Sequence, residues 1–279
     1  MQIKGWKYYN HAAIPTCAPH EIPDMSPVLN GDIWKIDGGM PLFLKWTSEF
    51  DCGKETLYWY TVKDAPFSVE ELSKSAKKHI RQAKNKCYVS KIDIGRNINE
   101  LFRVYEEAFE RYSVADNRVC FEEFQKRCFA DLEQGIEYWG GYCIENDIMI
   151  GYMTVANHKD YAEICTSKFS CQYLKLRVSD ALYSTVLEHY LNVENKKYVT
   201  SGSRNINHIT NSEEYKIQTF GYRRAYCRLH IKYNPKINRF IKLIYPFSGL
   251  LRMFDKITFF HRINAVLKME KIVREQGRL

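Results

Sequence analysis

Residues 197–232 read KYVTSGSRNINHITNSEEYKIQTFGYRRAYCRLHIK, and they pack a strand, a polar loop, a helix and a second strand into a short stretch. The β-branched and aromatic residues of 198–201 predict the first strand. A helix is predicted over 211–220, where an Asn or Ser can cap its start, and Gly221 can take the positive φ that ends it. Extended alternation over 222–233 predicts the second strand.

The chain before this stretch alternates between helical and extended patterns. We predict two amphipathic helices, three strands and a further helix, at 99–112, 121–132, 137–145, 148–157, 161–173 and 176–191. A short polar turn joins the first two strands, which indicates an antiparallel meander. The helix between the third strand and the strand at 198 favours parallel pairing of those two strands.

The ends of the chain differ in composition from its centre. Residues 1–66 are rich in Pro, Gly and aromatics, and 41–50 and 55–62 are predicted to form a hairpin. Residues 236–279 mix apolar anchors with Lys and Arg. The predicted organisation is a β-rich N-terminal region at 1–66, a central domain at 67–235 and a basic amphipathic helical tail at 236–279.

A basic helix is predicted over 68–86, with Ser68 and Glu71 at the spacing of a capping box. Lys77, Lys78 and Arg81 belong to a positive stripe on this helix, and they are candidates for binding an anionic substrate. The alternative is a solvated helix face with no ligand.

The formal net charge is +8, and it is unevenly distributed. Residues 67–98 carry 8 basic and 3 acidic groups, and residues 236–279 carry 10 and 3. This favours an anionic partner: a phosphate-bearing donor, a nucleic acid such as tRNA, or a membrane surface. The tail is a candidate for peripheral contact with an anionic membrane, and the alternative is a tail packed on the domain or on a partner subunit.

Nine cysteines without a CxxC pair, and the absence of a signal-peptide pattern, predict a cytoplasmic protein with reduced thiols. The basic tail extends this prediction to a position at the inner face of the membrane. His and Cys residues lack ligand spacing, so no metal site is expected. A serine or cysteine hydrolase is disfavoured because no G-x-S-x-G elbow precedes a helix.

The order of two helices, a three-stranded meander, a crossover helix, a strand, a helix and a strand is that of GNAT acyltransferases, and the chain resembles that superfamily. The SKSAKKHIRQAKN helix and the GSRNINHIT…YKIQTFGYRRAYC block resemble the FemAB-like branch and bacterial capsule-cluster acyltransferases. The resemblance covers 68–235. It implies an α/β (α+β) fold with a mainly antiparallel, GNAT-like central sheet flanked by helices. The β-rich N-terminal region would be a degenerate GNAT half, and the C-terminal tail would be helical.

The resemblance also implies a donor. GNAT enzymes hold the pyrophosphate of coenzyme A in a Q/R-x-x-G-x-G/A turn that opens the crossover helix, where small residues let the backbone approach an anion. The matching residues are Gln172, Lys175 and Arg177, followed by Val178, so long basic side chains replace both glycines. Lys175 and Arg177 could contact phosphates themselves. FemAB-like enzymes lack the cradle and use aminoacyl-tRNA, so acyl-CoA (acetyl-CoA) is the first expectation for the donor and aminoacyl-tRNA the second.

Acyl transfer needs a base for the nucleophile and an acid for the leaving group. His208 is the best base candidate, since imidazole titrates near neutral pH; the alternative is a residue that caps the loop. The resemblance assigns leaving-group protonation to Tyr215, with Tyr222 as second choice; either tyrosine could instead be a packing residue. Three polar loop residues are candidates for the acceptor: Ser203, Arg204 and Asn205.

We therefore expect an acyltransferase that carries out N- or O-acyl transfer, from acyl-CoA, to a sugar or amino-sugar acceptor. The surface-glycan context of that acceptor is implied by the resemblance alone. Two alternatives stay open: an aminoacyl-tRNA-dependent FemAB-like transferase, and a non-catalytic GNAT-shaped module that binds nucleic acid or membrane. The sequence specifies neither the acyl group nor the oligomeric state.

Overall fold

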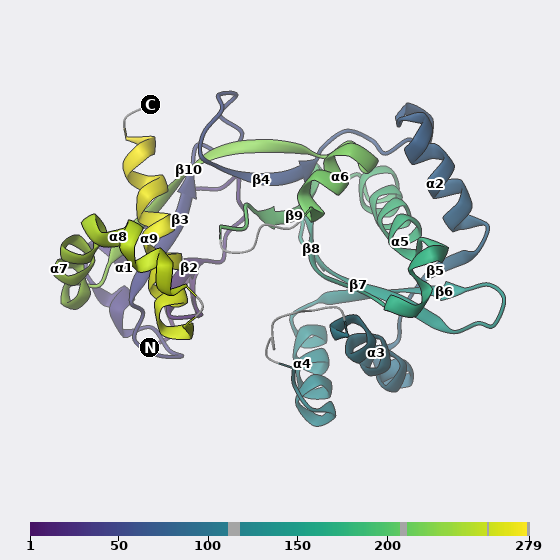
Figure 1. Cartoon of the computed structure of the whole chain (residues 1–279), viewed down its shortest axis with the longest axis horizontal. Coiled ribbons are helices and arrows are strands. Elements are labelled where there is room, and N and C mark those ends of the chain that lie inside the picture. The colour runs from purple at the N-terminus through teal and green to yellow at the C-terminus, as the bar shows by residue number, and fades with distance from the viewer. Residues whose placement is uncertain (111–117, 207–210, 256, 278–279) are drawn as a thin grey trace. The chain divides into compact units, whose positions relative to one another are not determined.

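The computed structural model describes residues 1–110, 118–206, 211–255 and 257–277, and the chain folds into two compact units (Figure 1). The first unit comprises Met1–Tyr60, Ser203–Thr210 and Arg224–Leu279. The second comprises Thr61–Gly202 and Asn211–Arg223. Three strands run through a boundary between the units: β4 (Tyr58–Lys63), β9 (Tyr198–Ser203) and β10 (Arg223–Tyr233). The domain boundaries expected after residues 66 and 235 stay a prediction.

The second unit contains the predicted meander. Its strands follow the order β5-β6-β7-β8-β9, with β5 at Cys87–Lys91, β6 at Ile136–Cys143, β7 at Met149–Asn157 and β8 at Tyr161–Phe169. Neighbours from β5 to β8 are antiparallel, and β8 and β9 are parallel as predicted. The strand predicted over 161–173 is too long, because the 3₁₀ helix η3 (Cys171–Leu176) follows β8.

Helices cover both faces of this sheet (Figure 1). Helices α2 (Lys74–Lys84) and α5 (Val178–Leu187) lie on one face, and α3 (Ile94–Phe109) and α4 (Phe121–Glu133) on the other. Alternate residues of the strands serve the two faces: Trp139 and Met153 pack toward α5, whereas Tyr138 and Tyr152 pack toward α3 and α4. After α5 the chain continues as the π-helix η4 (Glu188–Val193), and α6 (Ser212–Phe220) ends at Gly221, whose φ of 70° confirms the predicted cap.

The basic helix starts later than predicted. Val69–Glu71 forms a short 3₁₀ helix, η2, and the capping box predicted at Ser68 is wrong, because Ser73 is the cap of α2. The Ser73 hydroxyl accepts a hydrogen bond from the Ala76 amide at 3.2 Å. The buried residues of α2 are Ala76, Ile80 and Ala83, which are three or four residues apart and so lie on one face of the helix.

In the first unit, β1 (Trp6–Tyr9) and β2 (Ala12–Pro15) form a hairpin, and β2 pairs in parallel with β3 (Phe43–Ser48). The hairpin predicted between 41–50 and 55–62 is wrong, because β3 pairs with β10 instead. Two short helices precede β3: α1 (Ser26–Leu29) and η1 (Asp32–Lys35). The described part of the chain has no helix with the length and apolar character needed to span a membrane.

The C-terminal tail is helical, as predicted. It consists of α7 (Pro235–Ile244), η5 (Tyr245–Phe247), α8 (Ser248–Leu251), η6 (Arg252–Phe254) and α9 (Thr258–Gln276). Asn234 caps α7 by accepting a hydrogen bond from the Lys236 amide, and Pro235 occupies the first turn, where its missing N–H costs nothing.

Candidate active site

Strands β8 and β9 pair at three positions and then part. The pairs are Tyr161 with Tyr198, Ala162 with Val199, and Glu163 with Thr200. Beyond them β8 keeps its ladder with β7 as far as Phe169. We call residues 164–169 of β8 and 201–202 of β9 the strand parting.

A β-bulge occurs in β8 where the strands part. Thr154 of β7 lies opposite Thr166, but the next residue, Val155, lies opposite Ile164, so Cys165 is the extra residue. A bulge bends the strand that carries it and increases its local twist. The bend therefore turns β8 away at the point where its pairing with β9 ends.

The start of α5 lies close to the sheet because two glycines face it. A Cβ on Gly141 would lie 2.4 Å from Val178 Cγ2, and one on Gly151 would lie 3.2 Å from Val178 Cγ1. Val178 is 1% exposed. This candidate cofactor residue therefore acts by packing, and it sets how closely the first turn of α5 approaches the sheet.

Arg177 stands where the cradle of GNAT enzymes has its second glycine, and it adopts the conformation that favours glycine. Its φ of 61° and ψ of 37° are left-handed. The backbone turn before α5 is thus of the glycine type although the side chain is long and basic. Gln172 and Lys175 are exposed on η3, where their side chains are accessible to a ligand.

Arg177→Gly is expected to give a protein more stable than Arg177→Ala by about 1 kcal/mol, because a left-handed backbone costs a residue with Cβ about that much. Both variants lose the ion pair of Arg177 with Asp180, in which Nη1 and Oδ2 lie 3.5 Å apart. The comparison therefore isolates the backbone. Urea denaturation measures it, and equal stability of the two variants would contradict the assigned conformation.

Tyr215 of α6 reaches the first turn of α5. Its hydroxyl donates a hydrogen bond to the Asp180 carboxylate and lies 3.2 Å from Ser179 Oγ. Asp180 is 2% exposed. Burial, followed by the negative charge of Asp180, raises the pKa of Tyr215, so its hydroxyl stays protonated at physiological pH. The structure thus places a protonated phenol at the helix start that Arg177 precedes.

The other residues predicted for catalysis and acceptor binding have different surroundings. Tyr222 is 3% exposed in the core of the second unit, and within the described residues its hydroxyl has no hydrogen-bond partner. His208 lies outside the described residues. The loop residues Ser203, Arg204 and Asn205 belong to the first unit.

Two of those loop residues have defined partners. The Ser203 hydroxyl accepts a hydrogen bond from Tyr58 at 2.8 Å. Arg204 donates from Nη1 to the Leu57 carbonyl at 2.5 Å, and its guanidinium lies 4.5 Å from the centroid of Trp59. These contacts fix the loop on β4, whereas Asn205 is exposed.

The positive stripe on α2 is partly neutralised. Lys77 and Arg81 share the carboxylate of Glu70, at 3.3 and 3.2 Å. Lys78 is exposed and has no ion pair among the described residues. Exposed ion pairs of this kind are weak, so an anion could still compete for the stripe.

Glu163, the last residue of β8 that pairs with β9, is a candidate site residue that was not predicted from the sequence. Its Oε1 lies 4.0 Å from the position that a Cβ on Gly202 would occupy, so the carboxylate lies against β9 at the strand parting. Nothing in the sequence marks Glu163 as a site residue, because it is one polar residue in a strand that alternates apolar and polar residues. Only the position of the parting identifies it.

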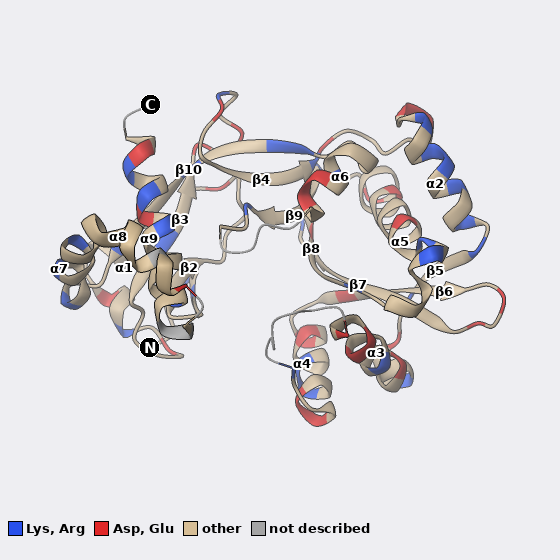
Figure 2. Ribbon diagram, viewed as in Figure 1, with Lys and Arg blue, Asp and Glu red and all other residues tan. Residues whose placement is uncertain are grey.

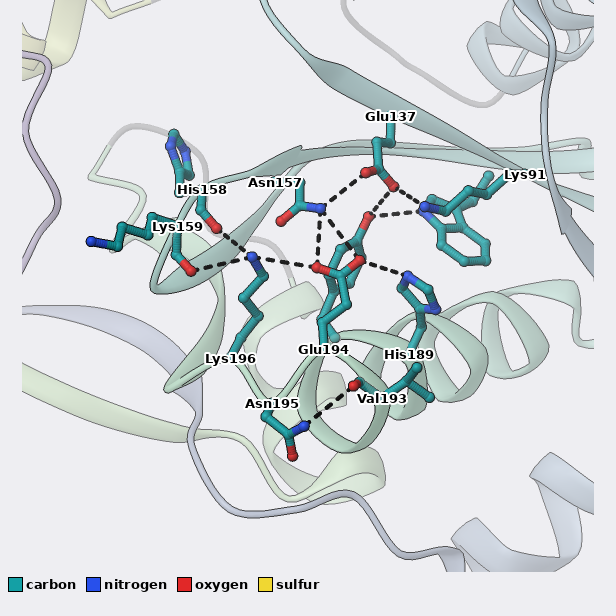
Figure 3. A network of polar contacts seen from close by, with 12 residues as sticks. Lys91, Glu137, Asn157, His158, Lys159, His189, Val193, Glu194, Asn195 and Lys196 are labelled. Atoms are coloured by element: carbon teal, nitrogen blue, oxygen red, sulfur yellow. Dashed lines mark hydrogen bonds and ion pairs between the residues drawn. The ribbon is translucent and has the colours of Figure 1, made fainter.

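A second polar cluster fixes the paired end of β8 and β9 (Figure 3). Asn157 donates to Glu137 at 3.0 Å and to Glu194 at 3.1 Å, and His189 lies 2.8 Å from Glu194. Lys196 donates to the carbonyls of two residues in the turn before β8, His158 and Lys159, and pairs with Glu194 at 3.3 Å. The cluster ties the segment before β9 to the turn between β7 and β8.

No protein-family model matches this sequence, and no curated protein matches it. Solved structures do match. One is described as FemX, at 7% identity over 79% of this chain and 81% of that chain, with a TM-score of 0.53. Another is L-PGS from Bacillus licheniformis, at 11% identity over 80% and 78% of the two chains, with a TM-score of 0.48. A third is a tandem GNAT protein from the clavulanic acid biosynthesis pathway, at 10% identity, 80% and 75% coverage and a TM-score of 0.45.

At 7% identity the similarity to FemX shows the fold alone. The chain has a GNAT-like mixed α/β fold with a mainly antiparallel sheet flanked by helices, and this confirms the predicted fold class. Across the residues that the structure describes, no group of three or more His, Cys, Asp or Glu side chains could hold a metal ion.

Proposed function

We propose that this protein is an acyltransferase that moves an acyl group from acyl-CoA to the amine or hydroxyl of a sugar or amino-sugar acceptor in surface-glycan biosynthesis. The observation that carries the proposal is the strand parting, because its residue Phe169 and the first residue of α5, Val178, both lie against Gly151. A strand that has lost its neighbour presents main-chain N–H and C=O groups at its edge. The amides of a pantetheine arm can pair with these groups as an added strand would.

The phosphates of the donor would lie at the first turn of α5. A helix N-terminus attracts anions through its dipole and its unpaired N–H groups. Arg177 and Lys175 add positive charge to a turn whose backbone already has the glycine-type conformation. The basic residues at the two glycine positions thus supplement the helix start, and they do not exclude a donor that carries a pyrophosphate.

The chemistry follows from the groups around the parting. The acceptor's nitrogen or oxygen attacks the thioester carbonyl, and its proton goes to the Glu163 carboxylate, directly or through a water. Before the transfer, Asp180 orients the Tyr215 hydroxyl by accepting its hydrogen bond. When the C–S bond breaks, this hydrogen bond breaks too and the leaving thiolate takes the proton of Tyr215. The proton held by Glu163 then returns through solvent to the Tyr215 phenolate, which restores both side chains. His208 stays an alternative base.

The test is an acyl-transfer assay on the full chain with acetyl-CoA and a panel of amino-sugars and sugars, read by mass spectrometry of the acceptor. We expect acceptor-dependent acetylation, and Tyr215→Phe is expected to lower kcat by about 10²-fold, since the general acid is lost. Tyr88→Phe is the matched control, because Tyr88 also donates to a carboxylate, that of Asp147, but lies on β5. It should keep the wild-type rate.

A parallel reaction supplies charged tRNA in place of acetyl-CoA. If charged tRNA supports transfer and acetyl-CoA does not, the donor assignment is wrong although the protein is a transferase. If neither donor supports transfer to any acceptor, the catalytic proposal fails and a binding module becomes the better description.

A further inference from the structure

The C-terminal helices of the first unit carry a series of large apolar side chains that are exposed to solvent. The side chain of Leu243 is 70% exposed and that of Met253 is 77% exposed. We call the full set the tail surface: Phe240, Leu243, Phe247, Leu250, Met253, Phe254 and Ile257. Exposed apolar residues are usually scattered singly, and a series this dense marks an interaction surface.

The tail surface is held in place from its inner side. Asn264 of α9 is 1% exposed, and it donates to the Leu251 carbonyl at 3.1 Å and to Asp255 Oδ1 at 2.8 Å. The guanidinium of Arg274 lies 3.9 Å from the ring centroid of Tyr245. Ile241 and Leu267 are buried. The helices that carry the exposed side chains are therefore held by hydrogen bonds, a ring contact and buried residues of the same unit.

Helix α7, which carries part of the tail surface, also carries Lys and Arg residues (Figure 2). Lys236, Arg239 and Lys242 are exposed, and within the described residues none of the three has an ion pair. Lys236 and Phe240, and likewise Arg239 and Leu243, are four residues apart, so each pair neighbours on the helix surface. No Asp or Glu occurs between Pro235 and Phe254. The stripe on α2 differs, because Lys77 and Arg81 there share Glu70.

We infer that the tail surface binds a bilayer that contains anionic lipids. Apolar side chains with adjacent cations suit the boundary between acyl chains and headgroups, where the former are buried and the latter contact phosphates. A second copy of the chain fits less well, because a two-fold contact would place both sets of α7 cations together. This inference does not depend on the proposed acyl transfer.

The experiment is sedimentation of the full chain with vesicles of phosphatidylcholine alone and vesicles of equal parts phosphatidylcholine and phosphatidylglycerol. We expect binding to the anionic vesicles only. The triple variant Lys236→Gln, Arg239→Gln, Lys242→Gln is expected to bind about 100-fold more weakly, at about fivefold per cation. Leu243→Ser with Phe247→Ser should also weaken binding at least tenfold, since apolar area is lost.

Two control proteins match these changes elsewhere on the surface. Lys7→Gln, Lys54→Gln, Lys126→Gln removes the same charge from exposed positions, and Ile22→Ser with Leu29→Ser removes apolar side chains that are 90% and 83% exposed. Both should bind the vesicles as the wild type does.

Three results would overturn the inference. The first is no preference for anionic vesicles. The second is equal weakening in the control proteins. The third is a dimer, in analytical ultracentrifugation, that Leu243→Ser with Phe247→Ser converts to a monomer while no vesicle binding is seen, which would assign the tail surface to self-association.

Discussion

Glu163→Gln is expected to lower kcat for acyl transfer by about 10²–10⁴-fold, the range over which a general base contributes. Glu163 is the last residue of β8 paired with β9, and its carboxylate lies against Gly202 at the strand parting. Glutamine keeps the length and the hydrogen-bonding capacity of the side chain but cannot take a proton. The loss should therefore fall on kcat, with little change in the KM for acyl-CoA.

Glu145→Gln is the matched control, because Glu145 is exposed in the turn between β6 and β7. It removes the same negative charge and should leave the rate unchanged. Circular dichroism and urea denaturation would establish that both variants fold. A Glu163→Gln enzyme with the wild-type kcat would exclude Glu163 as the base, and His208→Ala would then be the next variant to measure.

The periodicities of the sequence predicted most elements of the second unit. Strands β6 and β7 have helices on both faces, so most of their residues are buried and they appear in the sequence as short apolar runs. The short edge strand β5 was missed, because its five residues, CYVSK, are too few to show alternation. The hairpin predicted for 41–62 failed since β10, which is remote in sequence, provides the partner of β3. The residues of one strand do not indicate which remote strand it pairs with.

Candidate site residues could be predicted from the sequence only where the residue type itself suggests a chemical role. Tyr215 was predicted from its position on a helix, and the structure places it at α5 beside Asp180, while its catalytic role stays a prediction. Arg177 was interpreted as a departure from a glycine cradle, yet its backbone is left-handed, a conformation that a non-glycine residue does not reveal in sequence. Glu163 is identified by where β8 and β9 part, and a bulge at Cys165 lies at that point. Such a bulge is a property of the pairing, so the sequence alone could not give it.

Lys196→Met is expected to destabilise the protein by about 3 kcal/mol, the scale of breaking a largely buried ion pair. The Lys196 side chain is 11% exposed, and it joins Glu194 to the carbonyls of His158 and Lys159 in the turn before β8. Methionine keeps the packing of the aliphatic stem but removes the ammonium group that donates to the two carbonyls and pairs with Glu194. Lys197→Met is the control, since Lys197 pairs with Asp160 at 2.7 Å while 65% exposed, and such pairs contribute about 0–1 kcal/mol.

The same variant should change how stability depends on acid. Burial raises the pKa of Glu194, but hydrogen bonds from Asn157, Lys196 and His189 outweigh it, so the pKa is lowered in the folded protein. The unfolded chain then binds more protons below about pH 4.3, and the stabilisation present above that pH is lost as pH falls through the folded pKa. Without Lys196 the folded pKa moves back toward its ordinary value, so the free energy of unfolding should fall less steeply between about pH 5 and pH 3. Lys196→Met and Lys197→Met could instead have equal free energies of unfolding with equal pH dependence. The polar cluster would then not fix the paired end of β8 and β9, and the bulge in β8 alone would have to set the strand parting.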